Sequence, residues 1–165
     1  MTSTVYYHKF DIGWLRIESL DDAIIRIDYA DTPEVSDNPD KVIKQCISEL
    51  NEYFSGERET FEVKIKPETH GTPFQKSVWE ELLQIPYGET ISYKVLAERI
   101  SGSNYSRAVA NANGKNPISI IIPCHRVIAS NNTLGGYTGG LDKKKLLLSV
   151  EGRQPCYINE IQLYY

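Results

Sequence analysis

The amino-acid sequence predicts an α+β protein in which a small β-sheet with one helix precedes a mainly helical C-terminal domain. Two observations predict this fold class. Apolar and polar residues alternate along three segments before residue 31, as they do in half-buried strands. Beyond residue 73 the apolar residues recur instead at helical spacing in several short stretches. A sheet-forming part is therefore expected first and a helical part second.

The N-terminal strands are expected at Val5–Phe10, Gly13–Ser19 and Ala23–Ala30. From Pro39 the apolar period becomes helical, and this stripe ends near Phe54. Cys46 lies within the stripe and is interpreted as a small core residue. Thr60–Ile65 alternates again and is expected to form a further strand.

A segment containing Pro, Gly and Thr at 66–73 has the composition of a connection between domains. We place the boundary there. This gives an N-terminal α/β domain at 1–65, a linker at 66–73 and a C-terminal domain at 74–165.

The C-terminal domain is expected to contain four helices. Their spans are Phe74–Ile85, a segment capped by Thr90 or Ser92 and ending at Ile100, a segment from Tyr105 to Gly114, and a short helix that begins at Asp142. In the last helix Leu146, Leu147 and Val150 are expected to face inward. The second and third helices are joined by a glycine-containing turn and form a candidate helix-turn-helix, although many helical proteins contain such a pair.

Charge and composition narrow the function classes. Residues 1–70 hold 8 Lys and Arg against 15 Asp and Glu, a net charge of −7, whereas residues 71–165 hold 10 against 7, a net charge of +3. Nucleic acid is therefore expected to bind the second half. The sequence has no run of roughly 20 apolar residues and does not begin like a signal peptide. A cytoplasmic protein without a membrane partner is expected, and three cysteines without a CxxC pair suit a reducing compartment.

The most apolar run, Ile118–Ile128, is expected to be a buried strand that delivers Cys124, His125 and Arg126 consecutively. A histidine and an arginine beside a thiol are predicted to lower its pKa and favour the nucleophilic thiolate. The alternative is an inert buried thiol. Adjacent residues of an extended chain point to opposite sides, so cooperation of Cys124 with His125 requires a bridging water or a local turn.

Other kinds of site are less well supported by the sequence. The three histidines, His8, His70 and His125, have no zinc-site spacing with Cys124, so no metal is expected. The glycine-rich segment Leu134–Leu141 lets a ligand approach the backbone closely. It matches neither a phosphate-binding loop nor a dinucleotide fingerprint.

Several motifs together resemble one family. They are FQKSVWEELLQIPYG at 74–88, GETISY at 88–93, RAVANANGKNP at 107–117, PCHRV at 123–127, GGYTGG at 135–140 and LLLSVEG at 146–152. In this order they resemble the O6-alkylguanine-DNA alkyltransferases, also called methylated-DNA–protein-cysteine methyltransferases. The resemblance implies a ribonuclease H-like N-terminal domain and a winged-helix-like C-terminal domain with the helix-turn-helix.

The resemblance also implies a catalytic set. Cys124 accepts the alkyl group, and His125 acts through a water to draw the proton from its thiol. Glu151 orients His125, and Asn116 helps to hold this network and the turn around it.

Further residues are implied to contact DNA and the substrate base. Arg107 fills the space that the rotated nucleotide vacates. Tyr93 assists rotation and contacts the guanine. Asn113 contacts DNA and lies next to the pocket. The implied pocket residues are Tyr93, Val127 through its carbonyl, Tyr137, Thr138 through its backbone N–H, Gly139 and Lys144.

The activity implied by the resemblance is direct repair of double-stranded DNA that contains O6-alkylguanine. The alkyl group moves irreversibly to the protein, so one molecule repairs one lesion and no cofactor is required. Metal ligands of some family members are missing from residues 1–65, where only His8 and Cys46 occur. A monomer is expected, while cooperative binding along DNA and repair of O4-alkylthymine stay open.

Two alternatives come from other functional classes. Alkyltransferase-like proteins bind lesions without chemistry, but they carry tryptophan at the position of Cys124, so the cysteine favours the enzyme. A helix-turn-helix transcription factor would explain the two short helices and leave PCHRV and Glu151 without a purpose.

Overall fold

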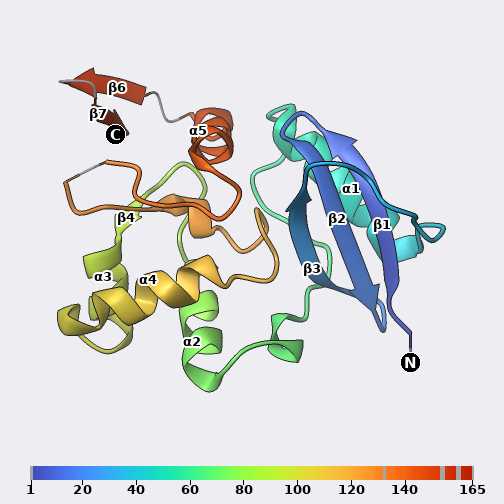
Figure 1. Cartoon of the computed structure of the whole chain (residues 1–165), viewed down its shortest axis with the longest axis horizontal. Helices are drawn as coiled ribbons and strands as arrows, with labels where there is room; N and C mark the ends of the chain where they lie inside the picture. Colours follow the sequence, from blue (N-terminus) through green and yellow to red (C-terminus); the bar gives the residue numbers. More distant parts are fainter. Residues whose placement is uncertain (1, 132, 153–154, 159–160, 165) are drawn as a thin grey trace. The chain divides into compact units, whose positions relative to one another are not determined.

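The computed structural model describes residues 2–131, 133–152, 155–158 and 161–164 (Figure 1). The chain forms two compact units. The first comprises Met1–His70 with Pro117–Ile121, and the second comprises Gly71–Asn116 with Ile122–Tyr165. Within the described ranges, none of the helices has the length and apolar character needed to cross a membrane.

The first unit is a three-stranded antiparallel sheet with one helix packed against it (Figure 1). The strands are β1 (Thr4–Phe10), β2 (Gly13–Leu20) and β3 (Ala23–Ala30), followed by the helix α1 (Lys41–Phe54). These three strands and the helix confirm the sequence prediction. The side chain of Asp40 caps α1 by accepting a hydrogen bond from the Ile43 backbone at 2.9 Å. Cys46 is buried in the helix, as predicted.

The strand expected at Thr60–Ile65 is wrong, because only Ile65 pairs, in a single parallel bridge with Ile24. The reason lies in the buried carboxylate of Glu49. It accepts hydrogen bonds from the backbone N–H groups of Glu62 and Val63 at 2.8 and 3.0 Å. A side chain therefore satisfies the donors that a neighbouring strand would have used.

The apolar run before Cys124 does not form the expected buried strand. Ile118 makes one bridge to Ile27 in the first unit, and the chain then bends at Ile120, whose φ is +74°. This left-handed conformation is unfavourable for a β-branched residue, and Ile120 is buried in it. The bend ends the strand pairing, so the chain reaches Cys124 through a turn.

The second unit is mainly helical (Figure 1). It contains α2 (Pro73–Leu82), α3 (Tyr93–Ile100), the short 3₁₀ helix η2 (Ser103–Tyr105), α4 (Ser106–Gly114) and α5 (Leu141–Val150). The strands β4 (Ile91–Ser92) and β5 (Val127–Ile128) pair in parallel, and β6 (Pro155–Ile158) and β7 (Ile161–Tyr164) pair antiparallel. The four expected helices are confirmed, with ends shifted by a few residues.

Local interactions explain where the helices of the second unit begin. Thr72 and Gln75 form a reciprocal capping box at α2. The side chain of Ser92 caps α3 by accepting from the Val95 backbone at 3.0 Å. α3 and α4 pack together across η2, which gives the predicted helix-turn-helix.

One prediction about α5 needs correction. The residues that α5 buries fully are Lys144, Leu147 and Leu148, whereas Leu146 and Val150 are only half-buried. From the apolar pattern, only Leu146, Leu147 and Val150 were expected on the inward face. A lysine takes one of these positions because backbone carbonyls surround its ammonium group, as described below.

Candidate active site

Cys124 begins a one-turn 3₁₀ helix, η3 (Cys124–Arg126), immediately after Pro123. Its backbone N–H donates to the carbonyl of Ile122 at 2.8 Å, which tightens the bend that precedes it. In a 3₁₀ turn the side chains of adjacent residues no longer point to opposite sides, as those of Cys124 and His125 would in an extended chain. The η3 helix supplies the local turn that was one of the two expected routes to their cooperation.

Cys124 lies in the wall of a cavity of about 390 Å³, although its side chain is only 4% exposed. The other lining residues come from α3, α4 and the glycine-rich loop: Tyr93, Ala110, Asn111, Asn113, Gly114, Gly136, Tyr137 and Thr138. A single thiol thus faces a space of the size used by small-molecule sites.

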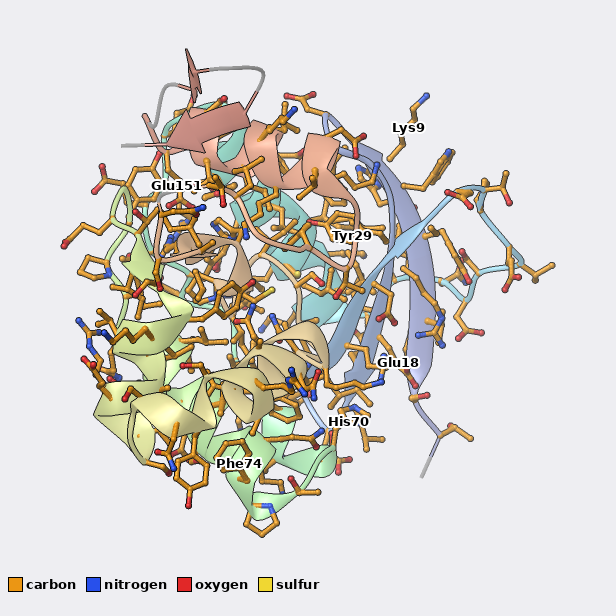
Figure 2. The ribbon with its side chains drawn as sticks, turned by 60° about the vertical axis from the view of Figure 1, so that its left-hand side comes forward. Lys9, Glu18, Tyr29, His70, Phe74 and Glu151 are labelled. Atoms are coloured by element: carbon orange, nitrogen blue, oxygen red, sulfur yellow. The ribbon has the colours of Figure 1, made fainter. Side chains whose placement is uncertain are left out.

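His125 is completely buried and lies against the carboxylate of Glu151. Glu151 is the C-cap residue of α5 and is labelled in Figure 2. The distance between His125 Nε2 and Glu151 Oε2 is 2.6 Å. The other ring nitrogen, Nδ1, is also buried and has no hydrogen-bond partner within the described part of the chain. One nitrogen of the ring is therefore engaged and the other is available to accept a proton.

Arg126 binds the same carboxylate from another side. Its Nε donates to Glu151 Oε1 at 2.8 Å and its Nη2 donates to Oε2 at 3.2 Å. The backbone N–H of Gly88 adds a donor to Oε1 at 3.1 Å. The Glu151 carboxylate therefore accepts hydrogen bonds from residues that lie at least 25 positions away from it in the sequence.

These contacts determine the charge of Glu151. Burial alone would raise the pKa of its carboxyl group, but the hydrogen bonds from His125 and Arg126 and the electrostatic interactions with these two residues outweigh burial and lower it. Glu151 is thus an anion that only accepts hydrogen bonds. It follows that Nε2 of His125 carries the hydrogen of the short contact, and that Nδ1 of the neutral ring carries the lone pair.

The prediction that the neighbours of Cys124 lower its pKa is wrong in net direction. Burial raises the pKa of the Cys124 thiol, and a hydrogen bond from Asn116 and the charge of Lys144 lower it only in part. The guanidinium of Arg126 is instead directed at Glu151. A buried thiol that stays protonated needs a base in order to become a nucleophile.

Lys144 binds the glycine-rich loop through hydrogen bonds to backbone carbonyls. Its buried ammonium group donates to the carbonyls of Val127 at 2.7 Å, Gly136 at 3.0 Å and Leu134. Burial lowers the pKa of Lys144 to about 8. Because the Val127 carbonyl already accepts from Lys144, only its second lone pair is left for the predicted contact with a base.

The remaining predicted residues fall into two groups. Asn113 and Asn116 support the turn, since they donate to the carbonyls of Cys124 at 3.4 Å and Ile122 at 2.8 Å. The Thr138 hydroxyl donates to the Gly114 carbonyl at 3.0 Å, which connects the glycine-rich loop with α4. Gly139 follows Thr138 in the loop and, within the described residues, is not part of the cavity wall. Arg107 is exposed in the first turn of α4, outside the cavity.

Sequence reasoning missed several parts of the site. The contribution of the Pro86–Gly88 turn was not foreseen, nor was the approach of Arg126 to Glu151. Gly88 has a φ of +79°, and an added Cβ would lie 3.3 Å from the Glu151 carbonyl oxygen. A glycine after Pro-Tyr was the available signal for a close approach of two backbones. Among the described residues no group of three or more His, Cys, Asp or Glu is placed to hold a metal ion.

Comparison with known proteins points to one family. Residues 73–153 match the family described as "6-O-methylguanine DNA methyltransferase, DNA binding domain", and residues 3–67 match its "ribonuclease-like domain". A methylated-DNA–protein-cysteine methyltransferase of Methanosarcina acetivorans is 50% identical over 113 residues, which cover 68% of this chain and 71% of the relative. The chain belongs to the methylated-DNA–protein-cysteine methyltransferase family.

Solved structures of this methyltransferase family share the fold. The O6-methylguanine methyltransferase of Mycobacterium tuberculosis is 36% identical, with a TM-score of 0.81 over 91% of this chain and 93% of that chain. A second crystal structure from the same organism contains DNA; it is 39% identical, with a TM-score of 0.79 over 88% of this chain and 90% of that one. The α+β fold expected from the sequence is therefore confirmed.

Proposed function

We propose that this protein repairs double-stranded DNA by transferring the alkyl group of O6-alkylguanine to the sulfur of Cys124. The observation that carries the proposal is that Cys124 lines a cavity and directly precedes His125, whose buried ring contacts Glu151. The names of its relatives, which are methylated-DNA–protein-cysteine methyltransferases, support the same reaction.

The chemical step is a displacement at the alkyl carbon. The thiolate of Cys124 forms a bond to that carbon, the bond from carbon to O6 breaks, and its electron pair stays with guanine. The proton lost by the thiol passes to His125 Nδ1 through a water molecule, and guanine takes up one proton as it leaves. Glu151 stabilises the imidazolium that forms. Because the donor is the damaged base and the acceptor is the protein, the reaction consumes no cofactor.

We infer that the reaction occurs once per molecule. A thioether at Cys124 has no group that water can expel easily, so the thiol is not regenerated.

The damaged base must also leave the base stack to reach a thiol in a cavity wall. Tyr93, Tyr137 and Thr138 line that cavity and are proposed to contact the base there. We propose a cytoplasmic protein that acts as a monomer on DNA; repair of O4-alkylthymine and cooperative binding are separate questions for the same assays.

Replacing Arg107 by alanine is expected to slow repair much more than it weakens binding. Arg107 is exposed at the start of α4, the second helix of the helix-turn-helix, where it can enter the space left by a rotated nucleotide. The affinity for undamaged duplex is expected to fall less than about tenfold, since the variant loses only one positive charge that can lie near a DNA phosphate. Base-analogue fluorescence and single-turnover repair are the measurements. Rotation and repair at the wild-type rates would contradict the proposed role.

The proposed function is tested by the mass of the peptide that carries Cys124. The protein is mixed with a duplex containing one O6-methylguanine and digested. We expect the mass of one methyl group on Cys124, restored guanine in the DNA, and a plateau near one methyl group per protein molecule. Tight lesion binding without a change in mass would favour a lesion-binding protein instead, and a methyl group on Cys46 would move the site to the first unit.

A further inference from the structure

The guanidinium of Arg126 is buried and makes contacts on several sides. Besides its two bonds to Glu151, its Nη1 donates to the Ile85 carbonyl at 2.7 Å, and its central carbon lies 5.8 Å from the centre of the Tyr87 ring. Two N–H groups directed at one carboxylate fix both the position and the plane of that carboxylate. The location of the Glu151 oxygens therefore depends on Arg126.

The orientation of Glu151 in turn decides the protonation of His125. Oε2 of Glu151, which Arg126 Nη2 also contacts, lies 2.6 Å from His125 Nε2. Neutral histidine has a single N–H group. When that hydrogen is on Nε2 it faces the anionic carboxylate, and Nδ1 keeps the lone pair. A carboxylate free to rotate would no longer favour this tautomer so strongly.

We propose that Arg126 is a positioning residue for alkyl transfer, whose guanidinium fixes the Glu151 carboxylate and thereby keeps Nδ1 of His125 as the proton acceptor. The inference rests on the proposed function, in which His125 receives the proton of Cys124. Arg126 acts through Glu151 and His125 and takes no part in the bonds that form and break.

Arg126 also affects the basicity of His125. Burial lowers the pKa of His125, and the charges of Arg126 and Lys144 lower it further, while Glu151 opposes them. Among the described residues, Arg126, Lys144 and Glu151 are the charged side chains that act on the ring. Removal of the Arg126 charge is therefore expected to raise the pKa of His125. Since only the neutral ring accepts a proton, the acidic limb of the rate profile should then move to higher pH.

Arg126→Met and Arg126→Lys test the inference against Arg26→Met as a matched control. Arg26 binds Asp28 with the same pair of atoms, Nε at 2.9 Å and Nη2 at 3.1 Å, but on the partly exposed sheet of the first unit. The single-turnover rate and its dependence on pH are measured at saturating O6-methylguanine duplex. The nitrogen NMR shifts of His125, which report the tautomer, are measured on the same proteins without DNA.

Arg126→Met is expected to slow transfer by about 10- to 100-fold, as for other residues that orient a catalytic group. It should also give a mixture of His125 tautomers and move the acidic limb to higher pH. Arg126→Lys should restore the position of the acidic limb, because the positive charge returns. It should restore only part of the rate, because one ammonium group cannot replace the two guanidinium N–H groups that bind the Glu151 carboxylate. Arg26→Met should behave as the wild type in all three measurements.

A slower Arg126→Met protein with the wild-type tautomer and pH profile would overturn the inference, because packing alone would then explain the loss. If Arg126→Met does not fold, Arg126→Lys decides the question, and wild-type rate and tautomer in that variant overturn it too. Failure of the proposed function looks different. In that case the wild-type protein transfers no methyl group, whereas the His125 tautomer of each variant can still be read.

Discussion

Cys124→Ser is expected to bind O6-methylguanine duplex with nearly wild-type affinity and to transfer no measurable methyl group. A serine hydroxyl is much harder to deprotonate than a thiol, and loss of a nucleophile typically costs at least about 10⁴-fold in rate. Asn116 and Tyr137 provide polar surroundings at this position, so a hydroxyl fits without leaving an isolated polar group. The rate is measured by single-turnover methyl transfer and the affinity by fluorescence anisotropy.

Cys46→Ser is the matched control, since it makes the same change at the other buried cysteine that the structure describes. Cys46 lies in the apolar core of the first unit, and burial raises the pKa of its thiol. A hydroxyl there is expected to destabilise the fold by about 1–3 kcal/mol, yet transfer stays at one methyl group per folded molecule. Retained transfer in Cys124→Ser, or loss of transfer in folded Cys46→Ser, would reverse the assignment of the acceptor.

His125→Ala and Glu151→Gln are expected to slow methyl transfer by about 10²- to 10³-fold each, and the double variant little more than either. The two side chains share a 2.6 Å contact and act on one proton, so their effects should not add. Single-turnover rates of the four proteins form the double-mutant cycle. Losses that multiply in the double variant would mean that the two residues work independently.

The pH dependence of Glu151→Gln should move in the direction opposite to that of Arg126→Met. In the wild type the pKa of His125 is below its ordinary value of 6.5, so the neutral, proton-accepting ring persists below that pH and the rate falls only as pH drops further. The negative charge of Glu151 opposes this lowering. Without that charge the pKa should fall again and the acidic limb should shift to lower pH. Urea unfolding serves as the stability control, because a buried Arg126 without its anion costs about 3–5 kcal/mol.

The sequence predicts the fold well where local pattern and tertiary pairing agree. The strands β1–β3 alternate and pair with their immediate neighbours, and α1 presents one apolar stripe to them. It fails where backbone donors find unexpected partners. Thr60–Ile65 alternates like a strand, but the Glu49 side chain takes its N–H groups. The apolar run before Cys124 is interrupted by the left-handed Ile120, which no periodicity indicates.

The candidate site was predictable as a set of residues but not as a network. The motifs drew attention to Cys124, His125 and Glu151 individually. What the sequence could not supply is distance, because Arg126 and Glu151 are 25 positions apart and Gly88 is 63 positions from Glu151. For the same reason Arg126 was assigned to the thiol, its neighbour in sequence, rather than to the carboxylate that it binds in space. Burial, which decides the pKa of Cys124, likewise becomes visible only after folding.

The placement of the two tryptophans has an optical consequence. Trp14 lies half-buried in β2 of the first unit, while Trp79 in the second unit is 2% exposed and donates its indole N–H to the Ala112 carbonyl at 2.9 Å. Each unit therefore has its own intrinsic fluorophore in a different environment. With Trp14→Phe the tryptophan emission comes from Trp79 alone. Trp79 packs α2 against α4, a helix that lines the cavity. Loosening of that helix can thus be followed by emission wavelength without attaching a dye.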